Sequence, residues 1–138
     1  MFKVFHRYIM HYLFFILFLL TPVVSFGQNQ TEEIITKEKG VTVVNTTSIA
    51  QDIEGYAGPT PVKIYIRKNK VERVEALPNI ETPRYFELVK QKIINKWDGQ
   101  RVDSAETLPV DVVTGATYSS EAVIQNVRRG ISYYKKTK

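Results

Sequence analysis

The sequence predicts a small single α+β domain, in which an antiparallel sheet containing a hairpin packs against two main helices. Two observations predict this class. β-prone stretches separated by turn residues fill the first half of the domain, and two stretches with apolar residues at helical spacing fill much of the second half. The 138-residue length and the absence of internal repeats favour one domain, which we place at residues 50–138.

Residues 1–27 have the features of a secretory signal peptide. Lys3 and Arg7 give a positive start, and an apolar run from Leu13 to Leu20 follows that is too short to span a bilayer comfortably. Small residues at positions 25 and 27 suit cleavage after Gly27. We therefore expect export to the periplasm or cell surface. If this segment stays uncleaved, it would instead anchor the protein in the membrane.

Composition excludes several kinds of chemistry. The 138 residues less the first 27 leave 111, with 17 Lys and Arg against 14 Asp and Glu, a net charge of +3. These 111 residues contain no cysteine, and both histidines, His6 and His11, precede them. A Ser-His-Asp triad, a thiolate nucleophile and a histidine-ligated metal site are thus excluded. We predict no catalytic residue, no metal and no nucleic-acid partner, and any redox chemistry requires a cofactor.

The predicted sheet begins after a polar leader. Residues 28–49 comprise this leader, expected to be flexible to about Gly40, and a possible first strand from Val41 to about Ser48. Alternation predicts a hairpin with strands at 62–67 and 71–77, joined by the turn Lys68-Asn69-Lys70. The alternation slips after Val71.

Two helices and one more strand are predicted in the second half. A helix from about Pro83 to Trp97 has Thr82 as its N-cap and proline at its first position, and Asp98-Gly99 ends it. Leu108–Val113 is expected to be a short strand. A last helix from about Ser120 to Tyr134 turns Ile124, Val127, Ile131 and Tyr134 to the core.

The junction before the last helix, DVVTGATYSS at residues 111–120, concentrates small and hydroxyl residues. The first turn of a helix has free amide groups and a partial positive charge, so it favours an anion such as a phosphate. Serine and threonine are also ordinary helix caps, and on these residues alone the ordinary cap is the simpler interpretation.

Asp111 to Thr117, DVVTGAT, resembles the flavinylation motif of the FMN-binding domain family, which is Asp, two free positions, Ser or Thr, Gly, Ala, Thr. The family includes the C subunit of the sodium-translocating NADH:quinone oxidoreductase and its Rnf-type relatives. The resemblance implies that a flavin transferase joins FMN by a phosphoester bond to the last threonine, Thr117. Asp111 is then expected to shape the turn or to be recognised by the transferase.

Two upstream segments also resemble the family. Gly55-Tyr56-Ala57-Gly58-Pro59 is similar to its glycine–tyrosine–glycine loop, and Glu81-Thr82-Pro83 to its Glu-Thr-Pro loop near the flavin. The family usually continues the second loop with glycine, whereas this chain has Arg84-Tyr85-Phe86. The cofactor-binding residues that the resemblance implies, beside Thr117, are Tyr56, Gly58, Glu81, Thr82, Pro83, Thr114, Gly115, Ala116, Tyr118, Ser119 and Ser120.

The function implied is electron relay by a covalently flavinylated, exported domain. A membrane reductase would donate electrons and an extracytoplasmic acceptor would take them, so the domain is a carrier rather than an independent enzyme. One alternative is an exported interaction module that keeps the fold without flavin. Another is a flavin-dependent reductase of a small substrate. Colour and fluorescence after denaturation separate the first alternative from a flavoprotein.

Overall fold

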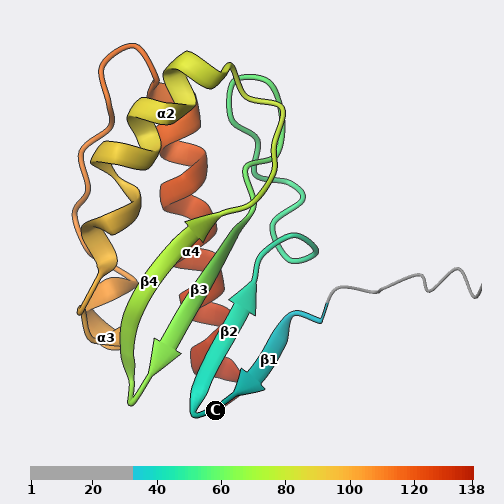
Figure 1. Ribbon diagram of the computed structural model, residues 1–138, viewed down its shortest axis with the longest axis vertical. Coiled ribbons are helices and arrows are strands. Elements are labelled where there is room, and N and C mark those ends of the chain that lie inside the picture. The colour runs from blue at the N-terminus through green and yellow to red at the C-terminus, as the bar shows by residue number, and fades with distance from the viewer. Residues whose placement is uncertain (1–32) are drawn as a thin grey trace, which may run out of the picture. The chain divides into compact units, whose positions relative to one another are not determined.

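The computed structural model describes residues 33–138, and the predicted signal peptide at residues 1–27 lies outside them. Four antiparallel strands form one sheet in the order β1-β2-β3-β4, and helices follow (Figure 1). This confirms the predicted α+β class. The strands are β1 (Ile35–Glu38), β2 (Val41–Asn45), β3 (Val62–Arg67) and β4 (Lys70–Ala76). The helices are α2 (Pro83–Lys92), the 3₁₀ helix η1 (Ile94–Trp97), α3 (Val102–Ala105) and α4 (Thr117–Lys136).

The hairpin of β3 and β4 is confirmed. Its turn places Lys68 and Asn69 at φ values of 48° and 62°, which matches the twist of a tight hairpin. Tyr65 pairs with Arg73 while Ile66 pairs with Val71, so Glu72 is an extra residue on β4. This β-bulge accounts for the slip in alternation that the sequence shows after Val71.

The leader is more ordered than predicted. Residues 35–38, expected to be flexible, form β1 and pair with β2 from Ile35 opposite Val44 to Glu38 opposite Val41. Most of β1 is exposed, so its sequence carries no hydrophobic alternation. The next strand, β2, ends at Asn45, three residues before the end predicted at about Ser48. Asn45 turns the chain there, since its Oδ1 accepts the Thr47 amide at 3.0 Å.

The helices also differ from prediction. The expected helix from Pro83 to Trp97 is divided into α2 and η1, and α3 is an additional short helix. Thr82 is the N-cap of α2 as predicted, although its hydroxyl makes no capping bond. Gly99, with φ of 77°, lies in the turn that follows η1. None of the helices within residues 33–138 is both long enough and apolar enough to cross a membrane.

The predicted strand at Leu108–Val113 is wrong, and α4 begins three residues earlier than expected. Side chains of α4 bind the backbone of this segment in place of a neighbouring strand. Arg128 Nη2 donates to the Leu108 carbonyl at 3.1 Å, and the Val113 amide donates to Ser120 Oγ at 3.1 Å. A β-prone sequence therefore runs beside a helix instead of joining the sheet.

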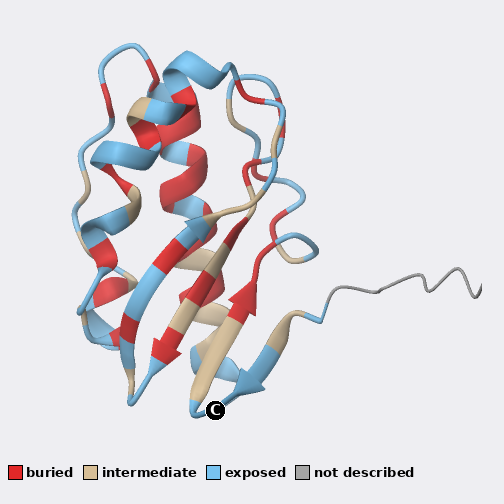
Figure 2. Ribbon diagram, in the orientation of Figure 1, coloured by how far each residue is buried: buried red, intermediate tan, exposed pale blue. Residues whose placement is uncertain are grey.

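The core lies between the sheet and the helices, where buried positions of β3 and α4 face each other (Figure 2). Val62, Ile64 and Ile66 alternate with less buried residues along β3. Gly130 allows α4 to approach β3 closely. A Cβ atom at that position would lie 2.5 Å from Ile64 Cδ1.

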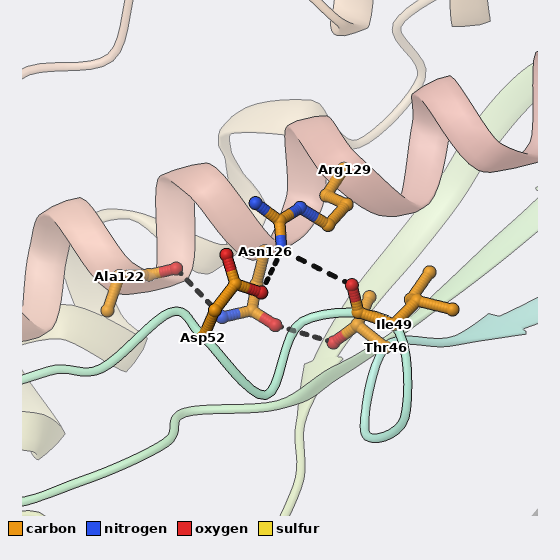
Figure 3. Close-up of polar contacts among 6 residues, drawn as sticks. All are labelled: Thr46, Ile49, Asp52, Ala122, Asn126 and Arg129. Carbon is orange, nitrogen blue, oxygen red and sulfur yellow. Dashed lines mark hydrogen bonds and ion pairs between the residues drawn. The ribbon is translucent and has the colours of Figure 1, made fainter.

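Polar contacts fasten the loop after β2 to α4 (Figure 3). Thr46 Oγ1 donates to Asn126 Oδ1 at 2.7 Å, and Asn126 Nδ2 donates to the Ala122 carbonyl at 3.0 Å. Arg129 pairs with Asp52 and donates to the Ile49 carbonyl. These contacts set the path of the chain into the loop at residues 55–58.

Candidate functional site

Three segments distant in sequence meet at one end of the domain. They are the loop at residues 55–58, the turn that leads into α2, and the start of α4, all at the upper end in Figure 1. Each of them contains a motif that the sequence singles out. The fold thus brings together the glycine–tyrosine loop, the Glu-Thr-Pro turn and the Thr-Gly-Ala-Thr turn.

A pocket of about 340 Å³ lies where these segments meet. This volume falls within the usual range for small-molecule sites. The residues that line it are Tyr56, Glu81, Thr82, Tyr85, Gly115, Ala116, Thr117, Tyr118 and Ser119. Eight of these nine were predicted as cofactor-binding or attachment residues, and Tyr85 is the ninth.

The turn before α4 gives the pocket an unusual helix start. Gly115 has a φ of 84°, a left-handed conformation that side-chain-bearing residues rarely adopt. The N-cap residue is Ala116, no side chain caps the helix, and the first turn contains no acidic residue. The amides of this turn therefore lack the side-chain acceptor that most helices supply, which leaves a positive dipole end beside the pocket.

The four serine and threonine hydroxyls of this turn have different surroundings. Ser120 is buried, donates to the Ala116 carbonyl at 2.6 Å and accepts the Val113 amide, so it secures the turn. Ser119 is also buried and donates to Glu81 Oε2. Thr114 and Thr117 are exposed, and only Thr117 of these two lines the pocket.

Glu81 joins two walls of the pocket. The residue is only 6 % exposed. Its Oε1 accepts the amides of Ala57 at 2.8 Å and Gly58 at 3.3 Å, while Oε2 accepts the Ser119 hydroxyl. Gly55 makes room for this carboxylate, because a Cβ atom there would lie 2.5 Å from Oε1.

Three aromatic side chains line the pocket. Tyr56 and Tyr118 are 76 % and 66 % exposed, and Tyr85 is 45 % exposed. Tyr85 is not among the cofactor-binding residues predicted from the sequence. The sequence feature that could have identified Tyr85 is its position one helical turn after Thr82. Tyr85 also lies in the segment where this chain lacks the glycine that the family usually has.

Other predicted residues lie near the pocket without lining it. Gly58 and Pro83 belong to the surrounding loops, and Gly58 contributes its amide to Glu81. Asp111 is exposed, and within residues 33–138 its carboxylate makes no hydrogen bond or ion pair, so the expected bonds to the turn are not formed. Trp97, the last residue of the helix predicted from Pro83, is fully buried in the core.

A second depression, of about 530 Å³, lies beside the other end of α4. None of the predicted site residues lines it. Among the described residues, no group of three or more His, Cys, Asp or Glu is arranged to hold a metal ion.

The pocket suits a ligand that joins an aromatic ring to a phosphate. Three tyrosines offer ring faces, and the uncapped start of α4 offers amides to an anion. Thr117 is the first residue of α4 and adds a hydroxyl at this helix end. FMN has both parts, so the residues present fit this cofactor.

A comparison with protein families gives the same result independently. The family model described as the FMN-binding domain matches residues 55–132, which include all three converging segments. No curated protein matches the chain significantly. Because the matched range covers more than half of the sequence and agrees with the pocket, the chain belongs to the FMN-binding domain family.

Proposed function

We propose that this protein is an exported electron carrier that holds FMN through a phosphoester bond to Thr117 Oγ1. FMN binding, and with it an electron-transfer type of role, follows from the family. The attachment rests chiefly on one observation. Of the four serine and threonine hydroxyls at residues 114–120, Thr117 alone is both exposed and part of the pocket wall.

The attachment would form one bond between Thr117 Oγ1 and phosphorus, with loss of the hydroxyl proton. The net change adds one FMN and removes one water. A threonine hydroxyl is a weak nucleophile, and a phosphate monoester has no good leaving group. A flavin transferase must therefore activate the hydroxyl and use a flavin donor whose phosphate carries a leaving group.

The start of α4 would stabilise the product. A phosphodiester carries one negative charge, and a helix N-terminus stabilises a nearby anion by roughly 0.3–1 kcal/mol when exposed. Ser120 and Gly115 would hold the turn in place, through the bonds to Ala116 and Val113 and through the left-handed backbone. The covalent bond would retain the flavin outside the cytoplasm, where free FMN is scarce.

When bound, FMN supplies the chemistry of one- and two-electron transfer. Tyr56, Tyr85 and Tyr118 would stack against its ring and shield part of it from water. Their exposure supports a flavin that lies close to the surface, where partner proteins can reach it. We propose a membrane reductase as the donor and an extracytoplasmic protein or quinone as the acceptor.

The intact mass of the protein tests the attachment. The protein would be produced with a signal peptide in a host that has a flavin transferase in its export compartment. We expect a gain of one FMN less one water in the wild type, complete loss of that gain in Thr117→Ala, and retention in Thr36→Ala. The second variant is the matched control, because Thr36 is also an exposed threonine but lies outside both the motif and the pocket wall.

An unmodified wild-type mass beside an active transferase would refute the covalent proposal. If the protein then also bound no free FMN, the interaction module without flavin would replace it. A gain retained in Thr117→Ala would refute Thr117 as the attachment residue.

A further inference from the structure

Glu81 is a buried carboxylate without a cationic partner. It is 6 % exposed, and none of the ion pairs formed within residues 33–138 includes it. Burying a charge is costly unless strong hydrogen bonds compensate. Here two backbone amides and one hydroxyl do so. Because this buried charge lies in the wall of the pocket, we expect Glu81 to have a role there in addition to its part in folding.

The contacts of Glu81 join parts of the site that no regular element connects. Oε1 holds the amides of Ala57 and Gly58, in the loop that carries Tyr56. Oε2 holds Ser119, two residues after Thr117 in the first turn of α4. One side chain therefore ties the tyrosine loop to the helix end that carries the attachment threonine.

The glycine loop is built around this carboxylate. A Cβ atom at Gly55 would lie 2.5 Å from Glu81 Oε1 and 3.0 Å from its Cδ. The glycine at position 55 and the glutamate at position 81 thus depend on each other, although 25 residues of sequence separate them.

We propose that Glu81 is a positioning residue that clamps the two walls of the flavin pocket together, and that its negative charge opposes reduction of the flavin. Uptake of electrons adds negative charge to the flavin, and a fixed carboxylate in the pocket wall disfavours that charge. The inference rests on FMN occupying this pocket, as proposed above, but it does not require the covalent bond.

Two substitutions separate the clamp from the charge. In Glu81→Gln the side-chain carbonyl still accepts the amides of Ala57 and Gly58, and the new NH₂ group donates to Ser119 Oγ. This variant keeps the clamp and removes the charge. Glu81→Ala removes both.

Hydrogen exchange of the Ala57 and Gly58 amides in the flavin-free protein tests the clamp. We expect exchange at least tenfold faster in Glu81→Ala and within about threefold of wild type in Glu81→Gln. The Gly99 amide is the internal control, because it donates to the Val71 carbonyl at 2.7 Å and neither residue lines the pocket. Unchanged exchange at Ala57 and Gly58 in Glu81→Ala would refute the clamp.

If Glu81→Ala does not fold, Ser119→Ala tests the same clamp by removing only its α4 end. We then expect exchange at Ala57 and Gly58 to rise more than about threefold, because the carboxylate is no longer fixed to the helix. Wild-type exchange rates in Ser119→Ala would overturn the proposal.

A redox titration tests the charge. At a fixed solution potential, the ratio of reduced to oxidised flavin should be about tenfold higher in Glu81→Gln than in wild type. An unchanged ratio would show that the carboxylate does not act on the flavin. If Thr117 proves to carry no flavin, the titration uses the protein saturated with free FMN, so failure of the attachment and failure of this inference give different results.

Discussion

At the scale of single residues, Gly115 sets the direction in which the chain enters α4. Its φ of 84° lies in the left-handed region, and no atom would obstruct a Cβ placed there. Gly99 is a suitable control for Gly115, because its φ is 77° and a Cβ atom placed there would also meet no other atom. Gly99 lies in a turn that does not line the pocket. The two glycines meet the same backbone requirement at different places.

Substitution of each glycine by alanine should therefore cost the same stability but affect the flavin differently. A left-handed alanine costs about 1–2 kcal/mol, partly offset by a stiffer unfolded chain, so the net loss is about 1 kcal/mol in each variant. Denaturant titration should show equal losses, while the intact mass shows reduced flavin attachment only in Gly115→Ala. Equal flavin attachment in both variants would mean that the turn does not position Thr117.

At the scale of elements, the loop after β2 is held to α4 by Arg129 as well as by Asn126 (Figure 3). The hydrogen bond from Arg129 lowers the pKa of Asp52 below its usual value. A carboxyl whose pKa is lowered by folding stabilises the fold above its ordinary pKa. That contribution is lost as the pH falls through the lowered value.

We therefore expect Asp52→Asn to lower the urea midpoint at pH 7, and to lower it less at pH 3, which lies below the ordinary pKa of an aspartate. The effect should be small and reduced by salt, since both side chains are exposed. Urea titrations of both proteins at the two pH values check this. An equal difference at pH 7 and pH 3 would contradict a role of the carboxylate charge.

At the scale of the whole molecule, the position of α4 on the sheet determines where Thr117 lies. Gly130 permits the close approach, because a Cβ atom there would lie 2.5 Å from Ile64 Cδ1 and 3.0 Å from Thr46 Cγ2. Alanine is the better helix former by about 1 kcal/mol, but overpacking a core costs about 1–3 kcal/mol. Ile64 is fully buried, so its side chain cannot move into solvent to relieve the clash. The cost of overpacking should therefore exceed the gain in helix propensity.

We expect Gly130→Ala to destabilise the protein by about 1 kcal/mol or more. In an Ile64→Val background, which lacks the obstructing Cδ1 atom and itself costs about 0.5–1.5 kcal/mol, the same change should be nearly neutral. Denaturant titration of the four proteins measures this coupling. Additive losses would show that α4 is not held against Ile64 in this way.

The sequence determined the α+β class, the hairpin with a slip in its alternation, the start of α2 and the family, because each follows from local patterns. Alternation, turn residues and helical spacing act over a few neighbouring positions, and a motif such as DVVTGAT is contiguous. The same local patterns misplaced β1 and residues 108–113. In both segments the pairing partner, a strand or the side chains of a helix, decides the conformation.

Only the tertiary structure decided how the hydroxyls and the carboxylate of the site are used. Ser119, Ser120, Thr114 and Thr117 look alike in sequence, yet two are buried in hydrogen bonds and one of the others faces the pocket. Nothing in the sequence joins Glu81 to Gly55, and Tyr85 lines the pocket although it belongs to none of the three motifs. These relations arise when distant segments pack against each other, since burial and the supply of hydrogen-bond partners are properties of the folded chain.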